Sequence, residues 1–408
     1  MSHGNRNGLV GVLRVREFRF LWLAELCSVL GDQLARVALA VLVYGRTQSA
    51  VWSAVVYAMT FLPALSGGVL LSWLADRYRR RSVMVWLDLA RAGLVAVMAL
   101  PGVPLWALCA LLILVVLLGP PFGAAQNAVL PEVLPGELYE RGLAVRQVTG
   151  QAAQLVGFAG GGVLVAALGP GPALAGDAVT FLLSAALIRF GVADRPAVGG
   201  GREERGSVWR VVASVARDPR RRALVLLAWL VGWYVVPEAL AAPYADQLGA
   251  GTAVVGVLMA ADPLGSVLGA WLFVRFVPAG WRTRLVGVLA VGAGLPLVLC
   301  AFRPGVAVVF ALWGLSGAAS TAYLLQAQAG FVRATPEAER GRAIGVAASG
   351  IVAAQGVAVL VGGLWARLWD PATAVAVAGG VGAVLCLGCA VAWRRANRPL
   401  AGVAPTSG

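Results

Sequence analysis

The sequence from Leu26 to Leu42 is LCSVLGDQLARVALAVL, a stretch long and apolar enough to cross a lipid bilayer. Asp32, Gln33 and Arg36 nevertheless lie in its middle, and Glu25 comes directly before it. A charged side chain inside the hydrocarbon costs several kcal/mol unless it faces water or a partner. This stretch therefore predicts a membrane helix whose charged face points into a bundle of other helices.

The composition of the whole chain agrees with a membrane protein. Hydrophobic residues make up 60% and charged residues 13% of the 408 residues, whereas a soluble domain carries about 25% charged residues. We expect an all-α integral membrane protein with twelve transmembrane helices, each near the length that a bilayer requires. The apolar runs that predict them are about 18–44, 51–74, 82–100, 104–124, 141–168, 172–190, 223–245, 253–277, 284–302, 305–331, 341–366 and 371–393.

One connection differs from the short turns between the other runs. Gly191–Arg222 is polar and rich in glycine and arginine, and Val208–Ala216 within it is amphipathic, with Trp209 and Val212 expected to face lipid. We therefore predict an N-terminal six-helix half over 1–190, a linker with a short helix over 191–222, and a C-terminal six-helix half with a short tail over 223–408. Two such halves around a site at mid-membrane are typical of secondary transporters.

The basic charge predicts the orientation of the chain. The net charge is +14, and all 33 basic residues are arginines. If both termini are cytoplasmic, 28 of these 33 arginines lie on the inner side, which is the positive-inside bias of membrane proteins. The charge is thus expected to meet anionic lipid rather than nucleic acid, and we predict a multi-pass protein of a bacterial plasma membrane.

A short motif after the second run narrows the class of protein. Ser72–Val83 is SWLADRYRRRSV, which resembles the signature loop of the major facilitator superfamily. The resemblance implies an inner gate formed by Asp76, Arg77, Arg80 and Arg81, with Asp76 able to pair with an arginine or cap a helix. The alternative is that these arginines only set the topology. The matching positions are Leu74, Ala75, Asp76, Arg77, Arg80 and Arg81.

Four longer stretches resemble the macrolide-efflux and siderophore-exporter branch of that superfamily, which implies export in exchange for protons. On the run 141–168, Gly157, Gly161 and Gly162 match an antiporter motif and are expected to let helices approach closely. Phe158 replaces the proline of that motif, and Gln126 stands where branch members often have arginine. The four stretches are Phe18–Leu39, Ala124–Pro135, Gly176–Leu187 and Ala261–Ala270.

The acidic residues inside the spans are the candidates for proton coupling. At about 100° per residue, Glu25, Asp32 and Arg36 fall on one face of their helix, so all three should face inward. Asp32 and Arg36 could also form a purely structural salt bridge. Glu238 follows Pro237 and Asp262 precedes Pro263, and both are left open between packing and coupling.

Two further acids receive a structural interpretation. Asp88 lies three residues before Arg91 and is expected to pair with it locally. Asp177, near the start of the run 172–190, is expected to cap or pack.

Polar and aromatic residues on several runs predict a central substrate cavity. Amides, hydroxyls and rings with few fixed charges suit a bulky amphiphile, although each ring could instead pack or face lipid. The residues are Tyr57, Gln147, Gln151, Gln154, Trp233, Tyr234, Ser316, Ser320, Tyr323 and Gln355.

These observations predict a secondary transporter, proton-coupled and exporting a hydrophobic or amphiphilic compound such as a drug, a macrolide-like product or a siderophore. An importer of a small metabolite and a non-transporting receptor are the alternatives. No P-loop, metal-binding histidine set or Ser/His constellation is apparent, so we expect no enzyme activity, ATP use, cofactor or metal. The expected partners are the substrate, protons and lipid, and the expected state is a monomer.

Overall fold

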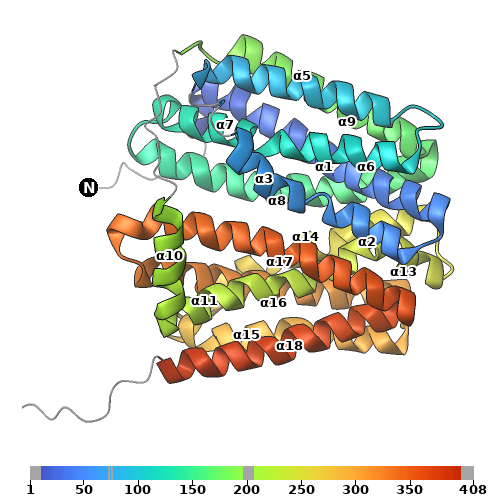
Figure 1. Cartoon of the computed structure of the whole chain (residues 1–408), viewed down its shortest axis with the longest axis vertical. Coiled ribbons are helices and arrows are strands. Elements are labelled where there is room, and N and C mark those ends of the chain that lie inside the picture. Colours follow the sequence, from blue (N-terminus) through green and yellow to red (C-terminus); the bar gives the residue numbers. More distant parts are fainter. Residues whose placement is uncertain (1–10, 72–73, 75–76, 196–205, 397–408) are drawn as a thin grey trace, which may run out of the picture.

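Long helices separated by tight turns make up the structure, which is a computed structural model describing residues 11–71, 74, 77–195 and 206–396 (Figure 1). No strand occurs within these residues. A helix satisfies its own backbone hydrogen bonds, which lipid cannot do, and this explains why apolar runs of this length become helices. The prediction of an all-helical membrane protein is confirmed.

The helices before the linker form what we call the N-terminal set. It begins with α1, which ends where Gln48 takes a left-handed conformation, and it includes α8 and α9, which are separated by Gly169 at φ 87°. Its helices are α1 (Arg16–Thr47), α2 (Ala50–Ala58), α3 (Leu62–Leu71), α5 (Arg80–Met98), α6 (Leu105–Leu117), α7 (Gly119–Val133), α8 (Glu137–Leu168) and α9 (Pro170–Gly191).

The helices after the linker form the C-terminal set. The linker itself contains α10 (Gly206–Arg217), and the seventh span is broken into several short pieces around Pro237 and Pro243. The elements of this set are α11 (Pro219–Trp229), η2 (Leu230–Val235), α12 (Val236–Ala239), α13 (Ala241–Gln247), α14 (Thr252–Phe276), α15 (Ala279–Val298), η3 (Leu299–Phe302), α16 (Val306–Ala334), η4 (Glu337–Glu339), α17 (Arg340–Leu368) and α18 (Pro371–Ala396).

Eleven stretches of the described chain are long and apolar enough to span a membrane. The third predicted span, α5, is not among them, because Arg80, Arg81, Asp88 and Arg91 interrupt its apolar sequence. It nevertheless packs in the bundle against α9, and with it the described chain has the twelve predicted spans.

The surface of the bundle is apolar in the manner of a lipid-facing protein. Large hydrophobic side chains such as Trp86, Trp106 and Phe302 are exposed by 71%, 75% and 81%. A soluble protein rarely exposes so many large apolar groups over its surface. The helices therefore use lipid, and not only each other, to remove apolar surface from water.

The buried core is distributed unequally between the two ends of the helices. We call the end of the bundle that carries α10 the linker end; it lies at the left of Figure 1. We call the opposite end the turn end; it lies at the right, near α2 and α13, and contains the turns at 48–49, 169 and 248–251. One large cluster combines both sets, including Val43 and Ala54 with Val236 and Tyr244. Two further clusters at the linker end each belong to one set, around Phe18 and around Phe331.

Candidate functional site

A buried hydrogen bond joins the two sets near the turn end. The Tyr57 hydroxyl of α2 donates to Oε2 of Glu238 in α12, and both side chains are buried. Glu238 lies in the broken seventh span, directly after Pro237. A carboxylate therefore sits in the interface between the sets, where a change in its charge would alter their contact.

Two further predicted coupling residues lie near this bond. Arg36 places its guanidinium carbon 5.4 Å from the centre of the Phe61 ring. Asp262 packs against α16, because a β-carbon added to Gly317 would lie 2.6 Å from its Oδ1. Arg36 and Asp262 each lie close enough to Glu238 for their charges to interact, so the three share one region of the interior.

Glu25 has a different partner, Arg146 of α8. Arg146 binds both carboxylate oxygens, with Nε 2.5 Å from Oε2 and Nη2 2.9 Å from Oε1. The same guanidinium donates to the side-chain oxygens of Gln126 at 2.9 Å and Asn127 at 3.2 Å. Glu25 is therefore one half of a bidentate ion pair rather than an unpaired acid.

A cavity of about 390 Å³ opens beside this pair, between α1, α7 and α8. We call it the glutamine cavity, after its lining by Glu25, Gln33, Arg146, Gln147, Gln151 and Gln154. Gln147, Gln151 and Gln154, which were among the predicted cavity residues, line this cavity together.

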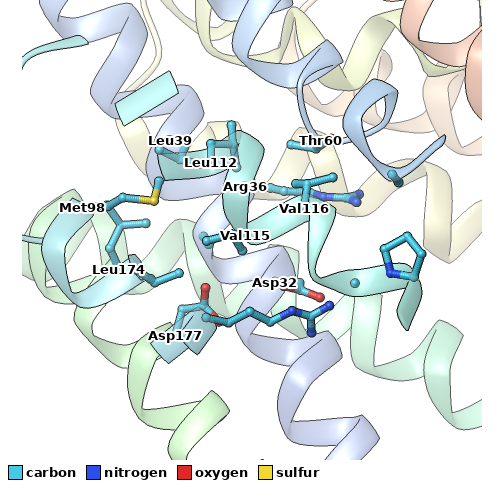
Figure 2. Close-up of a pocket in the computed structure, with 16 residues that line it drawn as sticks. Asp32, Arg36, Leu39, Thr60, Met98, Leu112, Val115, Val116, Leu174 and Asp177 are labelled. Carbon is cyan, nitrogen blue, oxygen red and sulfur yellow. The ribbon is translucent and has the colours of Figure 1, made fainter. Parts of the chain in front are cut away.

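A second cavity, of about 300 Å³, lies beside Asp32 and Arg36 of α1 (Figure 2). Asp32, Arg36, Arg91 and Asp177 line it together with apolar side chains such as Leu112 and Leu174. We call it the aspartate cavity. Arg91 lies 3.7 Å from Asp88 and stands between the rings of Phe122 and Phe181.

Glu25 and Asp32, which were expected on one inward face of the helix, therefore line two different cavities. The segment from Glu25 to Arg36 extends about 16 Å along the helix axis. Its two ends therefore meet different neighbouring helices. Glu25 faces α8, whereas Asp32 faces the space near α5 and α9. No ion pair joins Asp32 to Arg36 within the described part of the chain.

Asp177 lies deeper in the helix bundle than a residue that caps a helix would. It lies inside α9, almost completely buried, and accepts a hydrogen bond from Thr180. A β-carbon added to Gly31 would lie 2.2 Å from its Oδ1, so its carboxyl group rests against the backbone of α1 beside Asp32. Asp88 does pair with Arg91 and also accepts a hydrogen bond from Ser184 at 2.6 Å.

Two arginines of the signature loop have partners in the N-terminal set or at the start of the linker. Arg80 contacts Glu132 at 2.5 Å, and Arg81 contacts Asp194 at 3.4 Å. Arg77 is exposed, and Asp76 lies outside the described residues. Arg80 thus braces the N-terminal set, and Arg81 ties that set to the start of the linker. The inner gate stays a prediction.

Four predicted cavity residues belong to the packed interior of the C-terminal set instead. Tyr234, Ser316, Ser320 and Tyr323 are each exposed by at most 4%. The Tyr234 hydroxyl donates to the carbonyl oxygen of Ala290 at 2.6 Å, and its ring meets that of Tyr323 edge to face. Spacing along one helix cannot distinguish a face that lines a cavity from one that packs on a neighbour.

The remaining predicted aromatic and amide residues lie in the seventh and eleventh spans. Trp233 stacks on Trp365 of α17 with ring centres 5.5 Å apart. Gln355 lies where the two spans almost touch, because a β-carbon on Gly232 would be 2.8 Å from its backbone nitrogen.

The three motif glycines lie at helix crossings. A β-carbon on Gly157 would be 2.8 Å from Cβ of Gln33, and one on Gly161 would be 3.3 Å from Cα of Leu34, both in α1. One on Gly162 would be 2.8 Å from Cα of Gly256 in α14. These are the close approaches that glycine permits between membrane helices.

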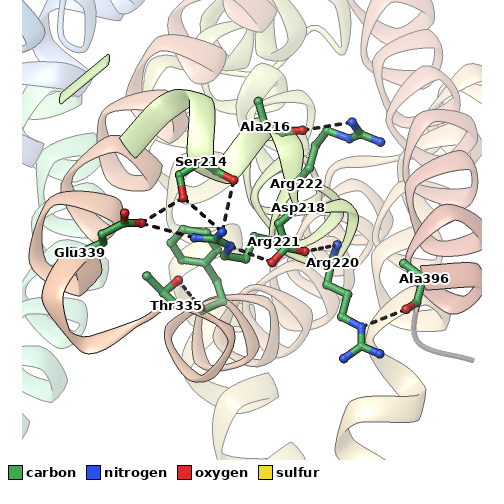
Figure 3. A network of polar contacts seen from close by, with 10 residues as sticks. Ser214, Ala216, Asp218, Arg220, Arg221, Arg222, Thr335, Glu339 and Ala396 are labelled. Carbon is green, nitrogen blue, oxygen red and sulfur yellow. Dashed lines mark hydrogen bonds and ion pairs between the residues drawn. The ribbon is translucent and has the colours of Figure 1, made fainter. Parts of the chain in front are cut away.

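The linker is attached to the C-terminal set by a polar network (Figure 3). Arg221 lies 2.9 Å from Asp218 and 3.6 Å from Glu339, and it donates to Ser214. Burial alone would raise the pKa of Asp218, but hydrogen bonds from Arg221 and from two backbone N–H groups hold it below its usual value. The network joins α10, the start of α11 and η4.

The amphipathic linker helix packs on protein as well. Val211 and Val215 are buried against Leu224, Phe331 and Trp393. The face of this helix that packs on protein is thus centred on Val211 and Val215, and Val212 is only partly buried.

Three residues of these sites were not predicted to line a cavity. Arg91 was expected only to pair with Asp88, Asp177 only to cap or pack, and Arg146 was counted only among the arginines of the inner side. Their signal was an ionisable residue inside an otherwise apolar run, which marks an interior position. Only the packing of α1 against α8 and α9 shows which groups they meet.

Helices in two sets, joined near one end and enclosing buried charged groups, define a membrane transporter. A family model described as the Major Facilitator Superfamily matches residues 21–238. The chain belongs to this superfamily, and the prediction of its fold is confirmed. No match was found among curated proteins.

Solved structures similar to this chain are also transporters. One is a bacterial homolog of the human lysosomal transporter Spinster, in an inward-facing and unoccupied conformation, with TM-score 0.68, 13% identity and coverage of 93% of this chain and 95% of that chain. Another is a POT family transporter in complex with a thioalcohol-conjugated peptide, with TM-score 0.71, 13% identity and coverage of 94% and 97%. A POT peptide transporter in complex with sulfate has TM-score 0.70, 13% identity and coverage of 93% and 95%. At such identities the likeness shows the fold alone.

Proposed function

We propose that this chain is a proton-coupled exporter of a hydrophobic or amphiphilic small molecule in a bacterial plasma membrane. The observation that carries the coupling is an excess of carboxyl groups in the interior of the spans. Five carboxyl groups, those of Asp32, Asp88, Asp177, Glu238 and Asp262, share this interior with the guanidinium groups of Arg36 and Arg91. Glu25 and Arg146 neutralise each other.

Such an excess favours the binding of protons. An ionised carboxylate in a low-dielectric interior is unstable without a counter-charge, and taking up a proton removes the charge. Glu238 is the best candidate for linking this proton to movement, because its hydrogen bond from Tyr57 crosses between the two sets. Breaking that contact changes the surroundings of the carboxyl group and hence its affinity for a proton.

The direction of transport rests on the resemblance of the four stretches to exporters. The fold itself accommodates the alternative, a proton-coupled importer of a small metabolite, since similar structures include peptide transporters. Accumulation of substrate in cells of a deletion strain would support export, and depletion would support import.

The coupling is tested in proteoliposomes with an imposed pH gradient. Glu238→Gln should abolish uphill transport while leaving downhill exchange of the same substrate, because binding survives and coupling is lost. Tyr57→Phe is the matched variant, since it keeps the carboxyl group and removes only the hydrogen bond. Uphill transport by Glu238→Gln with an unchanged pH dependence would move the coupling site to the aspartate cavity or to Asp262.

The orientation is tested by labelling intact cells with an impermeant thiol reagent. With the linker in the cytoplasm, Arg205→Cys should not react, whereas Thr252→Cys at the exposed turn end should. The reverse pattern would invert the topology.

A further inference from the structure

The glutamine cavity contains charged residues but offers no free charge. All three nitrogens of the Arg146 guanidinium are engaged, by Glu25, Gln126 and Asn127. Both carboxylate oxygens of Glu25 accept hydrogen bonds from the same guanidinium. A charged ligand would have to break this partly buried bidentate pair, which is costly because it leaves one partner unpaired.

The amide groups of the cavity are available, in contrast. Gln147, Gln151 and Gln154 lie on one face of α8, and within the described part of the chain none has a hydrogen-bond partner. Each amide presents a donor and an acceptor, so together they can bind groups that both donate and accept.

Gln33 supplies the most specific feature of this cavity. Its side chain is exposed by only 6%, and its Oε1 is buried without a hydrogen-bond partner. The close approach of Gly157 leaves Gln33 little room to turn away. A buried polar atom without a partner is unfavourable, and a ligand that supplies the missing hydrogen bond recovers that free energy.

The walls around these amides are fixed in place. Trp22 of α1 donates a hydrogen bond to Thr149 of α8 at 2.9 Å, and Val29 and Leu143 add apolar surface to the lining. The volume of about 390 Å³ is at the small end of ligand sites, which suits one chemical group of a larger molecule.

We propose that the glutamine cavity binds an uncharged group rich in hydroxyls or amides, such as a sugar ring, and discriminates against permanent cations and anions. The proposal rests on the proposed function, because it assigns this group to the substrate that the transporter carries. Hydroxyls both donate and accept and therefore match the amides, whereas an ammonium or a sulfonate finds no counter-charge.

Three aromatic probes that differ only in the attached group test this selectivity. They are phenyl β-glucoside, phenyltrimethylammonium and benzenesulfonate, and their saturable binding to the full chain in lipid nanodiscs is measured by saturation-transfer difference NMR without an ion gradient. We expect saturable binding of the glucoside alone. Gln151→Leu and Gln154→Leu, which keep the side-chain volume, should each weaken it about tenfold.

Gln328→Leu in the C-terminal set is the matched control and should leave binding of the glucoside unchanged. Tighter binding of a charged probe than of the glucoside by the unmodified chain would overturn the proposal. So would the absence of saturable glucoside binding, or glucoside binding that is the same in both cavity variants and the unmodified chain.

The ion pair between Glu25 and Arg146 provides a second test, which distinguishes a role in selectivity from a purely structural role. Glu25→Gln frees the guanidinium of Arg146 and should create binding of benzenesulfonate, whereas Arg146→Gln frees Glu25 and should create binding of phenyltrimethylammonium. If neither variant changes the preference among the three probes, the neutral pair does not set the selectivity and the proposal fails.

These binding measurements and the transport measurements can fail independently of each other. Binding is measured without a pH gradient, so selective glucoside binding together with transport that ignores the gradient would overturn only the proton coupling. Gradient-driven transport together with unselective binding would overturn only the assignment of the cavity.

Discussion

The turn end and the linker end of this molecule are held together in different ways. At the turn end, backbones of the two sets approach closely, at Gly162 against Gly256 and at Gly363 against Ala54. A single buried cluster combines side chains of both sets there. At the linker end each set has its own core, and the ion pairs of Arg80 and Arg221 join residues of the same set.

This difference predicts that the two sets separate more easily at the linker end than at the turn end. Small residues and buried apolar side chains allow close packing between the two sets, which we call the joint, and all of these contacts are lost together when the sets separate. Ion pairs confined to one set hold that set rigid without attaching it to the other. With the linker in the cytoplasm, as proposed, the sets share a buried cluster on the outer side, and among the described residues each set has its own buried cluster on the inner side.

The largest effect is expected from breaking the joint at the turn end. A β-carbon on Gly256 would lie 2.4 Å from Cα of Gly162 and 2.5 Å from the carbonyl oxygen of Phe158. Gly256→Val should therefore destabilise the closed turn end by about 3 kcal/mol, which is roughly a hundredfold in its population. Spin labels at Gln48 and Thr252 should report a longer distance, and transport should be lost.

Gly160→Val is the control for this variant, because a β-carbon at Gly160 meets nothing within 4 Å. It should leave both the distance and the transport unchanged. An unaltered distance in Gly256→Val would mean that the joint does not hold the turn end closed.

A smaller effect is expected from breaking the network at the linker end. Arg221→Ala removes the contacts with Asp218, Ser214 and Glu339 and should cost about 1–3 kcal/mol of stability. Thermal unfolding in detergent should show a lower midpoint, whereas the distance between the turn-end labels should not change. Arg217→Ala, at an exposed position of α10, should be close to the unmodified chain. A longer turn-end distance in Arg221→Ala would show that the two ends are not independent.

The smallest effect is expected from the pH dependence of Asp370, which caps α18 at the turn end. Burial alone would raise its pKa, but hydrogen bonds from Thr373, Gln247 and Arg303 lower it to about 2. Because the folded-state pKa lies below the value of about 3.9 for an unfolded chain, its stabilisation is present above that value and is lost as the pH falls through about 2.

Asp370→Asn should remove this dependence. Its unfolding midpoint should fall less steeply between pH 4 and pH 2 than that of the unmodified chain, by about 1–2 °C. Parallel curves for the two proteins would show that Asp370 does not hold this end of α18.

Much of the fold could be predicted from apolar runs and short motifs. Eleven of the spans are long and apolar enough to cross a membrane, and the Ser72–Val83 motif indicated the correct superfamily. The site was less predictable. Tyr234 and Tyr323 share the aromatic character of cavity residues yet pack in the core, because identity and spacing do not reveal what lies opposite a helix face.

The sequence by itself determined that this chain is a bundle of membrane helices, since backbone groups in lipid must bond within their own helix and apolar length decides where that occurs. It also showed that charged residues such as Glu25 and Asp32 must point inward. Only the tertiary structure decided which partners they meet. Glu25 finds Arg146 at a distance of 121 residues along the chain, and Asp32 shares a cavity with Asp177. Such contacts depend on the depth and rotation at which helices cross, and these are set by the packing of all neighbours together rather than by any one stretch.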